Sequence, residues 1–131
     1  MQNKVVRFVL ELGPRTHVGQ EQRNELCLLS VKDRVAQLKL NQVFKIYHGL
    51  SPDYLNVNFN RITSLHKYST RGSPYNFIVP RIQGQANNTF FYSGIQHWNS
   101  LPNSIKQINE LSRFKMATKK YLADQALMAE Q

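Results

Sequence analysis

Features that would mark a secreted protein or a membrane protein are scarce in this sequence. Cys27 is the single cysteine among 131 residues, so no disulfide can form within the chain. A lone cysteine favours a reducing compartment. No apolar run approaches the roughly 18 residues that a membrane-spanning helix needs, and Glu11 interrupts the apolar start, which makes a poor signal peptide. We therefore expect an intracellular protein, cytoplasmic or nuclear, that is not secreted and has no membrane partner.

Acidic residues are also few, and this imbalance is more informative. Eight Asp and Glu face 17 Lys and Arg, which gives a net charge of +9 and an isoelectric point near 9.9. A surface with this excess of positive charge attracts polyanions, so a basic domain of this size is a candidate for RNA or DNA binding. A basic protein without any polyanion partner has the same composition, and the charge alone leaves that alternative open.

Residue groupings that carry catalysis or bind metals are missing as well. The histidines His17, His48, His66 and His97 are scattered, whereas metal sites usually contain at least one pair of ligands close in sequence. No glycine-rich phosphate loop occurs, and the acids form no paired-carboxylate site that the sequence reveals. Cys27 stands between two leucines, so we expect a small buried side chain and not a thiolate nucleophile. The sequence thus predicts no catalytic residue, no metal site and no cofactor, and we do not expect the chain by itself to be an enzyme.

Helical periodicity begins almost at the first residue. The pattern predicts a helix that ends at Gly13-Pro14, followed by a short helix over 19–27. Apart from Asn3, no capping residue precedes the first helix, so we expect a piece cut from a longer chain. The apolar face expected on the first helix consists of Val5, Phe8, Val9 and Leu12.

The longest predicted helix covers residues 31–50. Ser30 and Asp33 resemble a capping box at its start, and Gly49 is a plausible stop. Apolar residues recur every three or four positions along it, which is typical of a helix with one buried side. The stripe expected to face the core consists of Val31, Val35, Leu38, Gln42, Ile46 and Leu50, widened by Val43 and Tyr47.

The second half of the chain mixes irregular and helical segments. Residues 56–73 are polar and rich in turn formers, so we expect irregular structure. Residues 75–82 favour a small β element at an edge, because Pro80 disfavours an interior strand. Helices are expected over 90–101 and over 109–127, the latter amphipathic and basic. The sequence therefore predicts one domain over residues 1–131 that is mainly α with a small β element (α+β), a compact helical domain around one long central helix.

The only tryptophan, Trp98, has two possible roles. It shares a predicted helical face with Phe91 and Ile95, and Pro102 ends that helix. An aromatic residue at helical spacing with apolar partners is usually part of the core, and its indole N–H then needs an acceptor such as a backbone carbonyl. A surface platform that stacks on bases is the alternative. We favour the structural anchor.

Basic residues interleaved with aromatics are the best lead to a binding site. Cations hold phosphates while aromatic rings stack on bases, although such segments can equally be solvated loops and charged helix faces. The candidate nucleic-acid-binding residues are Lys67, Tyr68, Arg71 and Arg81 in the irregular part, and Lys115, Lys119 and Lys120 on the last helix.

The order of several motifs resembles the carboxy-terminal region of reverse transcriptases from non-LTR (LINE-type, jockey-like) retrotransposons. These motifs are "MQNKVVRFVL", "GPRTH", "LLSVKDRVAQLKLNQVFKIYHGLSPDYL", "TRGS", "VPR", "FFYSGIQHWNSLP" and "LSRFKMATKKYL", and together they span nearly the whole chain. Singly they are weak; as an ordered set they are fairly specific.

The resemblance implies a segment that lies downstream of the polymerase palm and thumb. The family's Tyr-x-Asp-Asp metal motif is absent from this sequence, so no catalytic residue of the RNA-directed DNA polymerase can be assigned to it. We expect a non-catalytic segment that assists RNA or DNA binding. Docking of the first helix on the upstream polymerase domain, or a relic without function, are the alternatives.

Overall fold

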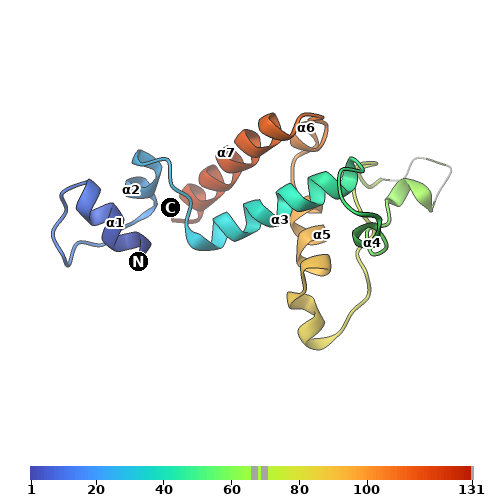
Figure 1. Ribbon diagram of the computed structural model, residues 1–131, viewed down its shortest axis with the longest axis horizontal. Helices are drawn as coiled ribbons and strands as arrows, with labels where there is room; N and C mark the ends of the chain where they lie inside the picture. The colour runs from blue at the N-terminus through green and yellow to red at the C-terminus, as the bar shows by residue number, and fades with distance from the viewer. Residues whose placement is uncertain (66–67, 69–70, 131) are drawn as a thin grey trace.

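The computed structural model describes residues 1–65, 68 and 71–130, and the regular elements within them are all helical. The mainly helical architecture that the periodicity predicts is therefore confirmed (Figure 1). The α-helices are α1 (Gln2–Val9), α2 (Gln20–Glu25), α3 (Val31–Tyr47), α4 (Asp53–Asn56), α5 (Phe90–Ser100), α6 (Asn103–Lys106) and α7 (Leu111–Glu130), and the 3-10 helices are η1 (Ile62–Ser64) and η2 (Gly84–Asn88).

Helix α3 is the centre of the fold, as expected. It packs against α5 and against α7, while α7 also contacts α2 and α6. Figure 1 shows α3 along the middle of the molecule, with α1 and α2 near its first residues and α4 near its last. The chain thus uses one long helix as the common partner of two later ones.

Local chemistry sets both ends of α3 where the sequence predicts. The Asp33 amide donates to Ser30 Oγ at 3.2 Å, and the Ser30 hydroxyl donates to Asp33 Oδ2 at 2.6 Å, so Ser30 caps the helix. At the other end Gly49 adopts a φ of 69°, and the Leu50 amide donates to the Lys45 carbonyl at 2.7 Å. This is a Schellman motif, whose left-handed residue favours glycine.

The main core is aromatic, and Trp98 lies within it. The Trp98 side chain is fully buried, and its Nε1 donates to the Tyr75 carbonyl at 2.8 Å. The prediction of a core anchor bonded to a backbone carbonyl is confirmed. Its ring stacks on Tyr47 with centroids 5.1 Å apart. The other large buried side chains of this core are Phe44, Phe77, Phe114, Leu40 and Ile95.

The buried side of α3 differs from the predicted stripe. Val43 and Ile46 are buried as expected, but Val31, Val35 and Leu38 are exposed by 66%, 46% and 53%. Helix α3 is apolar on more than one side, so periodicity alone cannot tell which sides α5 and α7 will cover. The covered sides carry Ala36, Gln37, Leu40, Val43, Phe44 and Ile46.

Helix α1 also turns a different side inward. Val6 is fully buried, whereas Phe8 is 85% exposed, and Val5 and Val9 are exposed as well. Two polar side chains of α1 hold the helix against the segment after it: Gln2 Nε2 donates to the Leu29 carbonyl at 2.6 Å, and Arg7 Nε donates to the Thr16 carbonyl at 2.8 Å. These bonds orient α1 so that the predicted apolar face points outward.

The expected β element is reduced to one bridge. Phe77 pairs antiparallel with Arg61, and no strand forms among the residues that the structure describes. On its other side the Phe77 backbone bonds to the Asn99 side chain, with Phe77 N–Asn99 Oδ1 at 3.0 Å and Asn99 Nδ2–Phe77 O at 2.9 Å. Because a side-chain amide takes the place of a neighbouring strand, and Pro80 lacks an N–H, the ladder does not extend.

Helices α5 and α7 match their predicted positions, and α7 reaches Glu130. On α7, the apolar Phe114 is fully buried, and so is the polar Thr118. Thr118 Oγ1 donates to the Phe114 carbonyl at 2.8 Å. That bond satisfies the hydroxyl within the helix, which explains why a polar residue is tolerated in the core.

Candidate nucleic-acid interface

The predicted binding residues fall into two separate regions. Lys115, Lys119 and Lys120 are exposed on α7, whereas Arg71 and Arg81 are exposed in the segment between η1 and α5. Tyr68 is 71% exposed in the same segment, and Lys67 and His66 lie outside the described residues. In Figure 1 the segment that leads into α5 lies toward the α4 end of α3, while α7 ends near the start of α3. The fold does not bring the two groups together.

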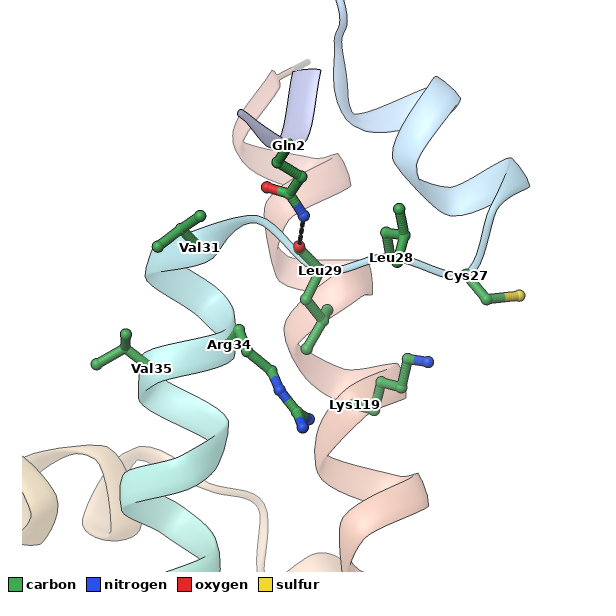
Figure 2. Close-up of a pocket in the computed structure, with 8 residues that line it drawn as sticks. All are labelled: Gln2, Cys27, Leu28, Leu29, Val31, Arg34, Val35 and Lys119. Carbon is green, nitrogen blue, oxygen red and sulfur yellow. Dashed lines mark hydrogen bonds between the residues drawn. The ribbon is translucent and has the colours of Figure 1, made fainter. Parts of the chain in front are cut away.

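A cavity of about 470 Å³ lies between α3 and α7 and joins one of these lysines to an arginine that sequence reasoning missed. Lys119 of α7 and Arg34 of α3 both line it, and its other walls include Leu28, Leu29 and Val35. Figure 2 shows Arg34 reaching from α3 toward α7, which carries Lys119. Arg34 is 85 positions before Lys119 in the chain, so only the packing of α3 on α7 could reveal the pair.

A second cavity of about 380 Å³ continues from the first. The two share Cys27, Leu28, Leu29 and Lys119, and the second adds Lys120, with Asp124 as its one acidic lining residue. We call the two cavities together the α3–α7 groove. It is a largely apolar surface with Arg34, Lys119 and Lys120 along it.

The turn between α2 and α3 forms one wall of this groove. Cys27 adopts a φ of 53°, and the Leu28 amide donates to the Arg23 carbonyl at 2.7 Å. This left-handed residue reverses the chain after α2 and leaves Cys27 exposed while Leu29 is buried. The expectation of a buried Cys27 is therefore wrong, because the turn and not the neighbouring leucines decides where the thiol lies.

Positive charge in the groove is not neutralised by neighbouring acids. Among the described residues one ion pair forms, between Arg113 Nε and Glu110 Oε2 at 3.1 Å, and both side chains are exposed. Arg34 donates to Gln37 Oε1, and the side chains of Lys119 and Lys120 make no hydrogen bond or ion pair with another described residue. These cations are available to an anionic ligand.

Positive charge also extends along α3 toward α5. Lys39 Nζ donates to Ser93 Oγ at 2.9 Å, which places this cation between the two helices. Burial lowers the pKa of His97, and the charges of Lys39 and Lys32 lower it further. The neutral form of His97 is thus favoured where α3 and α5 meet, since a third cation there would be repelled.

Lys106 has a structural role instead. Its side chain is buried, and its Nζ bonds to Asn76 Oδ1 at 2.6 Å and to the Asn99 carbonyl at 3.0 Å. Burial lowers the pKa of Lys106. This lysine ties the segment before Phe77 to the end of α5 and is not accessible to a ligand.

The described residues form no cluster of metal-binding side chains. Within them no three His, Cys, Asp or Glu side chains gather in a way that could hold a metal ion. His48 packs on Phe44 with ring centroids 4.2 Å apart, and burial lowers the pKa of His48.

Of the helices in the described part, not one combines the length and the apolar content that crossing a membrane requires.

Comparisons with known proteins add no identity. No family model matches the chain, and neither a curated protein nor a solved structure matches it.

Proposed function

We propose that this chain binds RNA or DNA through the α3–α7 groove, as the non-catalytic carboxy-terminal segment of a retrotransposon-encoded reverse transcriptase. The observation that carries the binding proposal is that Arg34 and Lys119, from helices far apart in sequence, line one cavity that contains no carboxylate. The net charge of +9 supports it, and the ordered motifs resembling the retrotransposon family supply the biological setting.

The groove suits a nucleic acid on chemical grounds. A guanidinium and two ammonium groups can each bond to phosphate oxygens. The apolar walls formed by Leu28, Leu29 and Val35 can bury sugar carbons or a base face beside those phosphates. Cationic residues position the strand, while the absence of acids in the first cavity avoids repulsion. The groove therefore offers sequence-tolerant binding dominated by phosphate contacts.

The test is fluorescence anisotropy of a labelled single-stranded RNA at several salt concentrations. The variant Arg34→Glu/Lys119→Glu is compared with Arg15→Glu/Lys45→Glu, which changes the net charge equally at residues that do not line the groove. We expect the groove variant to bind about tenfold more weakly than the control and to lower the salt slope by roughly 1.4, because two phosphate contacts are lost. Equal losses in both variants would contradict the assignment of the groove.

Cys27 offers an independent readout of the same site. It is the only cysteine, it is exposed, and it lines both cavities of the groove. We expect bound RNA to slow alkylation of Cys27 by N-ethylmaleimide in the native chain. Protection that persists in the Arg34→Glu/Lys119→Glu variant would show that RNA covers the thiol from elsewhere.

Docking on an upstream polymerase domain is a second candidate function. The specific observation in its favour is the exposed apolar face of α1, on which Phe8 is 85% exposed. An apolar helix face of this kind is typical of an interaction surface. A pull-down of the family's polymerase thumb with the wild-type chain and with Phe8→Ser tests it: retention by both or by neither contradicts docking through α1.

A further inference from the structure

A separate cavity of about 290 Å³ lies between the segment after α4 and the start of α5. It shares no lining residue with the α3–α7 groove. Its lining combines aromatic rings, carboxamides and aliphatic side chains and contains no charged residue. We call it the amide–aromatic pocket; the lining residues that matter chemically are Asn58, Asn60, Thr89, Phe91 and Tyr92.

The carboxamides in this pocket have unused hydrogen-bonding capacity. Asn58 and Asn60 are exposed, and neither side chain bonds to another described residue. Each carboxamide offers two N–H donors and one oxygen acceptor. Two such groups at one pocket can pair with a ligand edge that presents both donors and acceptors, as the edges of nucleobases do.

The aromatic rings are held in place by their own contacts. The Phe91 ring packs against the rings of Phe59 and Phe90, whose centroids lie 5.9 and 5.7 Å from the Phe91 centroid. The Tyr92 hydroxyl accepts a hydrogen bond from Gln96 Nε2 at 2.8 Å. Rings held in this way give a flat ligand an ordered apolar surface with little loss of side-chain entropy on binding.

Cations flank the pocket without lining it. Arg81 stands between two lining residues, Pro80 and Ile82. Arg61 follows Asn60 in the chain, but its guanidinium donates to the Tyr47 carbonyl and lies over the Tyr47 ring, 4.1 Å from the centroid. Arg81 is exposed and forms no hydrogen bond or ion pair with another described residue. The surroundings therefore suit a neutral, flat, polar group that is attached to an anionic one, which is the chemistry of a nucleotide.

An exposed apolar surface of α3 extends from the groove toward the start of α5. A cavity of about 400 Å³ is lined by Val35, Leu38, Lys39 and Phe90. Val35 also lines the α3–α7 groove, and Phe90 precedes Phe91 of the amide–aromatic pocket. From Val35 to Gln42 the helix rises about 10 Å. A nucleic-acid strand that follows this surface from the groove would reach the start of α5, where Phe91 lines the amide–aromatic pocket.

We propose that the amide–aromatic pocket is a slot for an unpaired nucleobase, read by Asn58 and Asn60 and stacked on the rings of Phe91 and Tyr92. The proposal rests on the proposed nucleic-acid binding and adds that single strands with bases are preferred to duplexes and to abasic strands.

The experiment compares a single-stranded oligonucleotide with an abasic strand of the same number of phosphates, using anisotropy at fixed salt. For the wild-type chain we expect about tenfold tighter binding of the strand with bases, the scale of one stacked base. The variant Asn58→Ala/Asn60→Ala removes the hydrogen bonds to the base and leaves the rings in place, so it should narrow the preference for the strand with bases and keep the salt slope. The matched control is Asn87→Ala/Asn88→Ala, which removes two exposed carboxamides from η2 outside the pocket lining.

Equal binding of both strands by the wild-type chain overturns the slot while leaving phosphate binding intact. Failure of every oligonucleotide to bind at low salt removes the proposed function, and a second measurement then decides on the slot. Uncharged nucleosides at millimolar concentration should shift the side-chain amide resonances of Asn58 and Asn60 in nitrogen-15 NMR spectra. Unshifted resonances with all four nucleosides overturn the slot whether or not oligonucleotides bind.

Discussion

The N-terminal region, residues 1–30, and the aromatic core formed by α3, α5 and α7 are built differently. In the core, three polar groups next to the buried rings each bond to a neighbour: the Trp98 indole, the Asn99 carboxamide and the Lys106 ammonium. His48 Nε2, beside the Phe44 ring, is the exception, because this atom is buried without a hydrogen-bond partner among the described residues. In the N-terminal region the buried side chains are Val6, Val18, Gln20 and Leu29, none of them aromatic, and its one aromatic residue, Phe8, points outward. The buried aromatic rings of this chain therefore lie in the core, where hydrogen bonds from neighbouring polar groups help to position them.

The difference explains where the candidate groove lies. The N-terminal region meets the core through α2, which contacts α7, and through the turn around Cys27. Aliphatic side chains and Gln20 are buried at this junction, without the aromatic rings that fill the core. The α3–α7 groove opens at the junction, and the cations of both long helices reach it.

The largest effect that tests this comparison is expected from Trp98→Ala. Trp98 is the largest of the fully buried side chains, and its loss leaves a cavity and an unpaired Tyr75 carbonyl. We expect the free energy of unfolding to fall by about 3–5 kcal/mol, measured by urea denaturation followed by far-UV circular dichroism. Trp98→Phe, which keeps a ring but no N–H, should cost less. A change near zero would contradict the placement of Trp98 in the core.

An intermediate effect is expected from Lys106→Met. The substitution leaves Asn76 Oδ1 and the Asn99 carbonyl without their donor, so we expect a loss of about 1–3 kcal/mol at neutral pH. Burial lowers the pKa of Lys106 below its ordinary value of 10.5. Between the lowered pKa and 10.5 the unfolded chain binds more protons, and the stability contributed by this residue rises with pH. The variant should lack that rise in urea titrations at increasing pH.

The smallest effect is expected from Phe8→Ser in the N-terminal region. Because Phe8 is 85% exposed, we expect the free energy of unfolding to change by no more than about 0.5 kcal/mol. Val6→Ser, in the same helix but fully buried, should cost clearly more. Similar costs for the two variants would mean that the apolar face of α1 is covered in solution, which sedimentation velocity at several concentrations can then detect.

Local signals predicted much of the fold. The Ser30 cap, the Gly49 stop and the Trp98 anchor depend on neighbours within a few positions or on strong apolar spacing, and all three are confirmed. The sides of α1 and α3 that were predicted to be buried are largely exposed, so this prediction was wrong. An apolar stripe does not specify which element will cover it. The strand around Phe77 was also wrong, since the Asn99 carboxamide, distant in sequence, occupies the position of a pairing strand.

The sequence by itself determined the longer helices, the two ends of α3, the aromatic anchor and the excess of positive charge; α1 ends at Val9, before the predicted stop at Gly13-Pro14. Each of these depends on residue type and short-range spacing, which are the same in any conformation of the chain. Tertiary structure alone decided which apolar faces are covered, that Cys27 is exposed, and that Arg34 joins Lys119 in one groove. Those outcomes depend on how α2, α3, α5 and α7 pack, because side chains far apart in the chain become neighbours only when helices meet.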